Sequence, residues 1–195
     1  MKKNCAFVLL ILCVLLLAAC SKKDKHPEWD ESWVRFDDFL AIEPPEGYVL
    51  SELHVKPSAT GIRYAVWVNG EEREVPDSEG HLIKAYDSQI YFVFTECQYE
   101  KYARDSMRSW MKMEGKKYQT GNARDFQVDD QAYRIVSLLA PRENQLYSHG
   151  VAAFGSRDKL ALSIEVLCSA DFEDSPHTIA EQFLTLLHFG ETEQS

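Results

Sequence analysis

Serine, cysteine and histidine side chains can act together as nucleophile and base, and the chain holds one neighbouring pair of this kind, Ser148-His149. Nucleophilic catalysis needs the hydroxyl or thiol to lie against the imidazole ring. This pair falls in a segment that reads as a strand, where adjacent side chains point to opposite faces, so we expect the two not to meet. The chain has no Gly-x-Ser-x-Gly motif and no glycine-rich phosphate loop. We therefore expect no enzymatic activity.

Metal binding would need histidine, cysteine or carboxylate ligands at close and regular spacing, and the sequence lacks it. No His-Glu-x-x-His or Cys-x-x-Cys occurs among the six histidines, which are His26, His54, His81, His149, His177 and His188. Asp171, Glu173 and Asp174 do not follow the alternation of a calcium loop. Acidic residues in front of a predicted helix are explained by the helix dipole. We expect no metal and no cofactor.

Arg63 and Trp67 are a candidate contact patch on a predicted strand. They alternate with Tyr64, Val66 and Val68, so they lie on the opposite face of that strand. If that face is exposed, the indole and the guanidinium form a surface of the kind found at protein interfaces. If a helix covers the face, Trp67 belongs to the core.

The N-terminal residues have the layout of a bacterial export signal. Lys2 and Lys3 precede an apolar run, Ala6 to Leu17, and small residues follow it before Cys20. The tetrapeptide Leu17-Ala18-Ala19-Cys20 resembles the lipobox of bacterial lipoproteins. The competing interpretations are an ordinary secretory signal and an uncleaved membrane anchor. The uncharged stretch, residues 4–21, falls short of the roughly 20 apolar residues that span a bilayer comfortably.

The lipobox resemblance implies cleavage before Cys20, a diacylglyceryl thioether on its sulfur and often a third acyl chain, a palmitate, on its amine. Two or more acyl chains anchor a protein stably. We expect a domain outside the cytoplasm that is anchored through Cys20 to the cell membrane or the outer membrane. Ser21 is not the aspartate that often retains lipoproteins at the inner membrane, and the sequence leaves open whether the envelope has one membrane or two.

An exported chain can form disulfides, and Cys97 and Cys168 are the cysteines that remain beside Cys20 once the signal has been removed. A disulfide between them is chemically allowed. Both follow apolar strand-like runs, so two buried free thiols are the alternative.

Length and composition indicate one acidic domain. We divide the chain into a signal peptide (1–19), a lipidated cysteine with a polar tether (20–35), a single domain (36–190) and a polar tail (191–195). The formal net charge is −10, and removal of Lys2 and Lys3 with the signal makes it −12. Such a charge argues against nucleic acid and against close contact with anionic lipid.

The hydrophobic pattern predicts short strands interrupted by two helices. Asn69-Gly70 favours a tight hairpin that returns through residues 71–75. Thr95 and Gln98 match a capping box in front of an amphipathic helix that ends at Gly115. Its apolar stripe, which we expect in the core, is Tyr99, Tyr102, Ala103, Ser106, Trp110 and Met113. Ser175 and Pro176 begin a last helix that ends at Gly190. The predicted strands are 39–42, 48–55, 62–68, 71–75, 82–85, 89–94, 125–128, 132–139, 147–154 and 160–167.

Meandering strands with few helices predict an α+β fold, an antiparallel sheet with helices packed on it. The order of these elements, with Pro-Pro-Glu-Gly-Tyr at residues 44–48 after a short strand, resembles the PsbP-like fold, an α/β/α sandwich found in photosystem II extrinsic subunits and bacterial lipoproteins. That resemblance implies no functional residue. We expect a membrane-anchored, non-catalytic interaction or assembly module with a protein partner. The alternative is a lipoprotein that binds a small molecule or ion in a pocket between sheet and helix.

Overall fold

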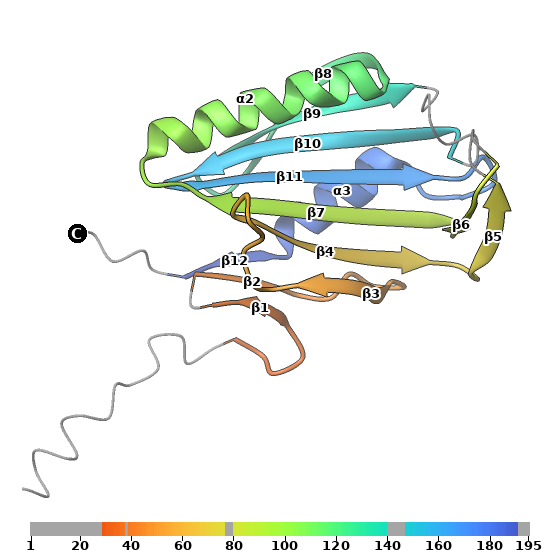
Figure 1. Cartoon of the computed structure of the whole chain (residues 1–195), viewed down its shortest axis with the longest axis horizontal. Coiled ribbons are helices and arrows are strands. Elements are labelled where there is room, and N and C mark those ends of the chain that lie inside the picture. Colours follow the sequence, from red (N-terminus) through yellow and green to blue (C-terminus); the bar gives the residue numbers. More distant parts are fainter. Residues whose placement is uncertain (1–28, 38, 77–79, 140–146, 191–195) are drawn as a thin grey trace, which may run out of the picture.

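The computed structural model describes residues 29–37, 39–76, 80–139 and 147–190. It confirms the predicted α+β class, because most of the described chain forms antiparallel strands with helices packed on them. A seven-stranded sheet runs in the order β3-β4-β7-β11-β10-β9-β8 (Figure 1). Its strands are β3 (Val49–His54), β4 (Ile62–Asn69), β7 (Ser88–Glu96), β8 (Gln119–Val128), β9 (Gln131–Leu139), β10 (His149–Arg157) and β11 (Leu160–Cys168).

Two smaller sheets accompany the large one. β1 (Val34–Phe36), β2 (Leu40–Ile42) and β12 (Leu187–Phe189) form a three-stranded sheet, in which β2 is the middle strand. β5 (Arg73–Pro76) and β6 (Leu82–Ala85) pair only with each other.

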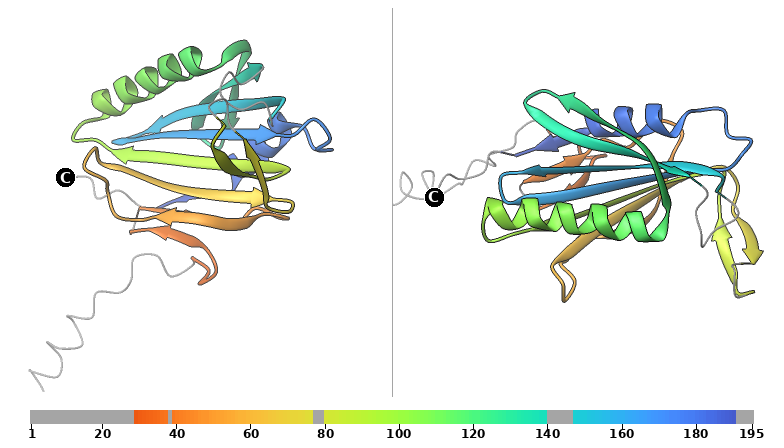
Figure 2. Two further views of the ribbon diagram at one scale, coloured as in Figure 1. Left: turned by 45° about the vertical axis from the view of Figure 1, so that its right-hand side comes forward. Right: turned by 90° about the horizontal axis from the view of Figure 1, so that it is seen from above.

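Helices α2 (Glu100–Lys117) and α3 (Pro176–Thr185) lie on opposite faces of the large sheet, as the view from above in Figure 2 shows. The α3 face holds the larger core, which also takes in the apolar side chains of the three-stranded sheet. The α2 face has a smaller core around Phe154, Leu138 and Tyr118, against which Met107, Trp110 and Met111 of the helix pack. None of the described helices is long and apolar enough to cross a membrane.

The hairpin predicted at Asn69-Gly70 is wrong. Gly70 does turn the chain with a positive φ of 93°, but β4 pairs with β3 and β7 and not with β5. β4 pairs instead with the nine-residue strand β7, which lies along its whole length. The side chains of Ile90, Phe92 and Phe94 in β7 are buried. Residues 73–76 then pair with β6 beyond the end of the sheet.

The ends of both helices differ from the prediction. Thr95 lies within β7 and donates its hydroxyl to the Gly61 carbonyl at 3.1 Å, so it forms no capping box. The helix begins after Tyr99 and continues through Gly115 to Lys117. Of its predicted apolar stripe, Ala103 is buried and Trp110 half-buried, whereas Tyr99, Tyr102 and Met113 are exposed. Ser175 and Pro176 do begin α3, but the helix ends at Thr185 because the next residues pair with β2 as a strand.

Candidate functional site

Three strand ends lie side by side at one end of the large sheet and bring the candidate site together. Asn69, Ser88 and Cys168 are register partners across β4, β7 and β11. Two backbone hydrogen bonds continue this alignment beyond the strands: Asp87 N–H donates to the Asn69 carbonyl at 2.9 Å, and Ser169 N–H donates to the Asp87 carbonyl at 2.8 Å. The segment that leaves β11 for α3 therefore runs past the residues that precede β7.

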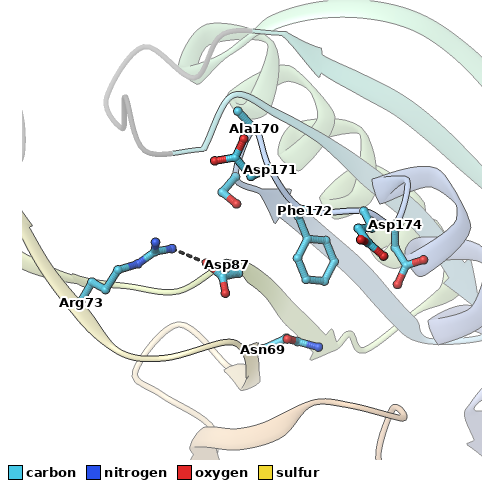
Figure 3. A pocket seen from close by; sticks show the side chains of 9 residues that line it. Asn69, Arg73, Asp87, Ala170, Asp171, Phe172 and Asp174 are labelled. Atoms are coloured by element: carbon cyan, nitrogen blue, oxygen red, sulfur yellow. Dashed lines mark hydrogen bonds and ion pairs between the residues drawn. The ribbon is translucent and has the colours of Figure 1, made fainter.

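A pocket of about 590 Å³ lies at this end of the sheet (Figure 3). Its size is within the usual range of ligand sites. In the view of Figure 3 the Phe172 ring lies between Asp87 and Asp174. The lining residues come from the end of β4, from β5, from the residue before β7 and from the segment after β11: Asn69, Arg73, Asp87, Ser169, Ala170, Asp171, Phe172, Glu173 and Asp174.

The pocket is acidic. Its one cationic side chain, Arg73, is paired with the Asp87 carboxylate. Within the described residues, no ion pair joins Asp171, Glu173 or Asp174 to a cation. These three carboxylates were explained from the sequence as acids at a helix N-terminus. The structure adds Asp87 and Arg73 to them, which the sequence could not do because 80 or more positions separate the two sets.

A hydrogen-bonded chain of three side chains lies next to this pocket. The Tyr48 hydroxyl lies 2.8 Å from Ser88 Oγ, which lies 3.4 Å from Cys168 Sγ. Burial raises the pKa of Tyr48 to about 12 and also raises the pKa of Cys168, while hydrogen bonds with Ser88 act in the opposite direction and Asp174 adds to both increases. Because the thiolate is the reactive form of cysteine, Cys168 is a poor nucleophile.

Ser148 and His149 do meet, contrary to the prediction. Ser148 Oγ lies 2.7 Å from His149 Nδ1. The prediction assumed that both residues lie in a strand, but β10 begins at His149. Ser148 lies just before the strand, so its side chain is free to turn toward the imidazole ring. Among the described residues, no carboxylate is recorded on the other ring nitrogen, so the pair lacks the third group that orients a catalytic imidazole.

Cys97 and Cys168 do not form the disulfide that the sequence allowed. Cys97 follows the last residue of β7, whereas Cys168 pairs with its first, Ser88. At about 3.3 Å per residue the two cysteines are roughly 30 Å apart, and a disulfide needs Cα atoms within about 7 Å of each other. Both are free thiols, Cys168 buried and Cys97 half-buried.

The contact patch proposed for Trp67 and Arg63 is also wrong, because both side chains are buried. Trp67 is completely buried under α3 and packs edge-to-face against Phe183 with ring centroids 5.1 Å apart. Arg63 is 8% exposed, and its guanidinium lies 3.0 Å from Asp37 and over the rings of Phe39 and Phe94. The alternative, a face covered by a helix, is the correct one.

The described histidines have structural partners. His54 stacks on Tyr64, His188 stacks on Trp33, and His177 Nε2 lies 3.1 Å from Ser137 Oγ. No group of three or more metal-ligating side chains occurs in the described part of the chain. Cys20 and the residues of the lipobox lie outside the described residues.

No family model and no curated protein matches the chain. Among solved structures, it is similar to the solution structure of the cyanobacterial PsbP protein, CyanoP, from Synechocystis sp. PCC 6803. The sequences are 13% identical, the TM-score is 0.46, and the match covers 80% of this chain and 89% of that one.

Proposed function

We propose that this chain is an exported lipoprotein, anchored through Cys20, whose domain is a non-catalytic interaction module outside the cytoplasm. The acidic pocket at the end of the sheet is the observation that carries the proposal. It offers three carboxylates, Asp171, Glu173 and Asp174, that have no cationic partner among the described residues, beside one aromatic ring. The proposed occupant is a lysine side chain of a partner protein.

Electrostatics favours this occupant. Like charges held close together repel each other, and a cation between them relieves that repulsion. The Phe172 ring, which lines the same pocket, adds an electron-rich face for an ammonium or guanidinium group. The formal net charge of −10 raises the rate at which a basic partner arrives.

The chemistry of the neighbouring residues supports binding over catalysis. The Cys168 thiol is kept protonated by burial, and the Ser148-His149 pair has no recorded carboxylate partner among the described residues. A stable lipid anchor also suits a protein that works by holding a partner at the membrane.

Zero-length cross-linking in intact cells tests the proposal, because a carbodiimide joins a carboxylate to an amine only when the two are in contact. The variant Asp171→Asn/Glu173→Gln/Asp174→Asn should lose a cross-linked species that the unchanged chain forms. Peptide mapping of that species should place the bond on one of the three carboxylates.

The matched control is Glu31→Gln/Glu96→Gln/Glu100→Gln, which removes the same number of exposed carboxylates from residues that do not line the pocket. It should cross-link as the unchanged chain does. Equal cross-linking by both triple variants would show that the pocket is not the contact. A hydrolase or transferase activity that disappears in Ser148→Ala or Cys168→Ala would overturn the non-catalytic proposal.

The volume of the pocket favours a second candidate, a small cationic molecule in place of a protein side chain. A pocket of about 590 Å³ can hold a short di- or polyamine. Calorimetric titration of the purified chain with spermidine distinguishes the two: saturable binding that the pocket variant loses supports the small molecule, and cross-linking without such binding supports the protein.

A further inference from the structure

The strand β3 is an apolar edge of the large sheet. All six of its residues are exposed, and among the described residues it pairs on one side only, with β4. Of the nine large hydrophobic side chains that are exposed in the described part of the chain, four lie within residues 49–55. They are Val49 (70% exposed), Leu50 (38%), Leu53 (45%) and Val55 (40%).

The strand β8 forms the opposite edge of the sheet and, unlike β3, has the features of an edge that is protected against pairing with other chains. Its residues are mostly polar, with the sequence Gln-Thr-Gly-Asn-Ala-Arg-Asp-Phe-Gln-Val. Arg124 forms an ion pair with Glu181 of α3, and Asp125 forms one with Arg134 of β9. Proteins commonly protect sheet edges with charges of this kind, because an unpaired strand offers its backbone groups to other chains. β3 carries exposed apolar side chains in their place.

We propose that β3 is a docking edge on which an extended segment of a partner protein adds as a further strand. The segment would alternate apolar side chains, which pack beside Leu50 and Leu53, with lysine or arginine side chains, which lie beside Glu52 and His54. Strand addition of this type takes its affinity from backbone hydrogen bonds and its specificity from alternate side chains. The inference rests on the proposed function only in that the module binds a protein, and it uses a different surface from the acidic pocket.

The alternation follows from the register of β3 on β4. Glu52 pairs with Val66 and His54 with Tyr64, so both lie on the α2 side of the sheet. Leu50 pairs with Trp67 and Leu53 with Ala65, which places them on the α3 side. A strand added beside β3 would meet Val49, Glu52 and His54 on one face and Leu50 and Leu53 on the other.

The face around Glu52 and His54 suits a cation. The His54 ring stacks on Tyr64 at 5.3 Å, and Tyr64 lies 5.6 Å from Tyr91, so the three rings form a row across β3, β4 and β7. Helix α2 packs on β8, β10 and β11 and leaves this part of the face uncovered by a helix (Figure 1). No lysine or arginine belongs to this face of the three strands, whose members are Val49, Glu52, His54, Ile62, Tyr64, Val66, Val68, Gln89, Tyr91, Val93 and Thr95.

Charge also argues against a second copy of the chain as the occupant. Antiparallel pairing of two β3 strands centred on Glu52 would place the two Glu52 carboxylates directly opposite each other on one face of the sheet. Like charges across paired strands are destabilising. Each copy also carries a formal net charge of −10. A basic partner removes both repulsions.

Binding of defined peptides to the purified full chain tests the proposal. The probe is a fluorescently labelled six-residue peptide that alternates lysine or arginine with valine, and the reference probe replaces each basic residue by glutamate. Fluorescence anisotropy should show saturable binding of the basic probe alone. Hydrogen exchange should show new amide protection in residues 49–54 when that probe is bound, because their free backbone groups become paired.

Two variants locate the binding. Leu53→Lys and Glu52→Lys should each weaken the basic probe by about tenfold, equivalent to about 1.4 kcal/mol. The matched controls Leu82→Lys and Glu71→Lys change an exposed leucine and an exposed glutamate elsewhere and should leave binding unchanged.

Three results would overturn the proposal. One is equal binding of both probes by all variants. Another is protection, in the chain alone, of the amides of residues 49–54 that point away from β4, which would mean that the chain itself covers the edge. The third is a dimer in sedimentation that Leu53→Lys dissociates, which would make a second copy the occupant. The two proposals can fail separately. If the basic probe does not bind β3 but the partner is still cross-linked to Asp171, Glu173 or Asp174, only the docking-edge proposal is wrong.

Discussion

Tyr48 links the pocket to the stability of the fold. Its hydroxyl lies 2.8 Å from Ser88 Oγ, and burial raises its pKa from an ordinary 10.0 to about 12. Between these two values the unfolded chain loses the tyrosine proton while the folded chain keeps it. The free energy of unfolding should therefore fall as pH rises from about 10 to about 12.

The variant Tyr48→Phe should make the free energy of unfolding fall less steeply with pH, because phenylalanine has no hydroxyl that can ionise in the unfolded chain. Urea titrations at several pH values between 9 and 12 measure it. Tyr99→Phe, which changes an exposed ring on the residue just before α2, is the control and should follow the unchanged chain. Identical slopes for all three proteins would show that Tyr48 ionises alike in both states.

Individual residues also show where sequence reasoning reaches its limit. Alternation along β4 correctly placed Arg63 and Trp67 on one face, opposite Tyr64. Alternation alone could not predict which face of β4 is buried under α3. That depends on the packing of a helix more than 100 residues further along the sequence. The sequence left open whether Arg63 is exposed or buried, and a buried arginine needs partners. Asp37 and two phenylalanine rings provide them from distant positions.

At the scale of elements, α3 is held to the sheet by polar contacts as well as by its apolar side. His177 Nε2 lies 3.1 Å from Ser137 Oγ of β9, and Glu181 forms an ion pair with Arg124 of β8. Burial lowers the pKa of His177 below 6.5, and the nearby Arg124 lowers it further, while Glu181 acts in the opposite direction. The folded chain thus favours the neutral ring.

This depressed pKa predicts acid sensitivity. As pH falls below about 6.5 the unfolded chain takes up the His177 proton before the folded chain does, so the free energy of unfolding should decrease. His177→Gln keeps a hydrogen-bonding group and should reduce that decrease between pH 6.5 and 5. Urea titrations measure it, with the exposed His54→Gln as control. A steeper loss of stability in His177→Gln would contradict the prediction.

Most elements could be predicted because their patterns are local, and the failures are those that depend on distant pairing. Apolar alternation identified β4 and β7, and Ser175-Pro176 identified the start of α3. The Asn69-Gly70 hairpin failed because β4 found a longer partner in β7. Gly190 failed as a helix end because residues 187–189 pair with β2, at the other end of the chain. Local propensity is commonly overridden by tertiary contacts of this kind.

At the scale of the whole molecule, the proposed anchor and the proposed binding surfaces lie in different parts of the chain. The predicted anchor precedes the domain, whereas the acidic pocket lies at one end of the large sheet and the apolar edge β3 along one side of it. The sequence could suggest the anchor, since a lipobox is contiguous. It could not predict the pocket, which joins Asn69, Asp87 and Asp171 through strand register, or the edge, which depends on the order of strands in the sheet.

The anchor gives the last prediction, because attachment should depend on a single sulfur atom. The proposed lipidation at Cys20 would supply two or more acyl chains, which hold a protein stably, whereas the polar segment after it is expected to have no comparable affinity for lipid. Cys20→Ala should therefore move the domain from the membrane fraction to the medium or periplasm if another site is cleaved, as fractionation and immunoblotting would show. Cys97→Ala, which removes a half-buried thiol of the domain, is the control and should stay in the membrane fraction.

If Cys20→Ala stays in the membrane with an unprocessed signal, the apolar run itself is sufficient for attachment. If it stays there with the same processed mass as the unchanged chain, Cys20 carries no lipid and the lipoprotein proposal is wrong.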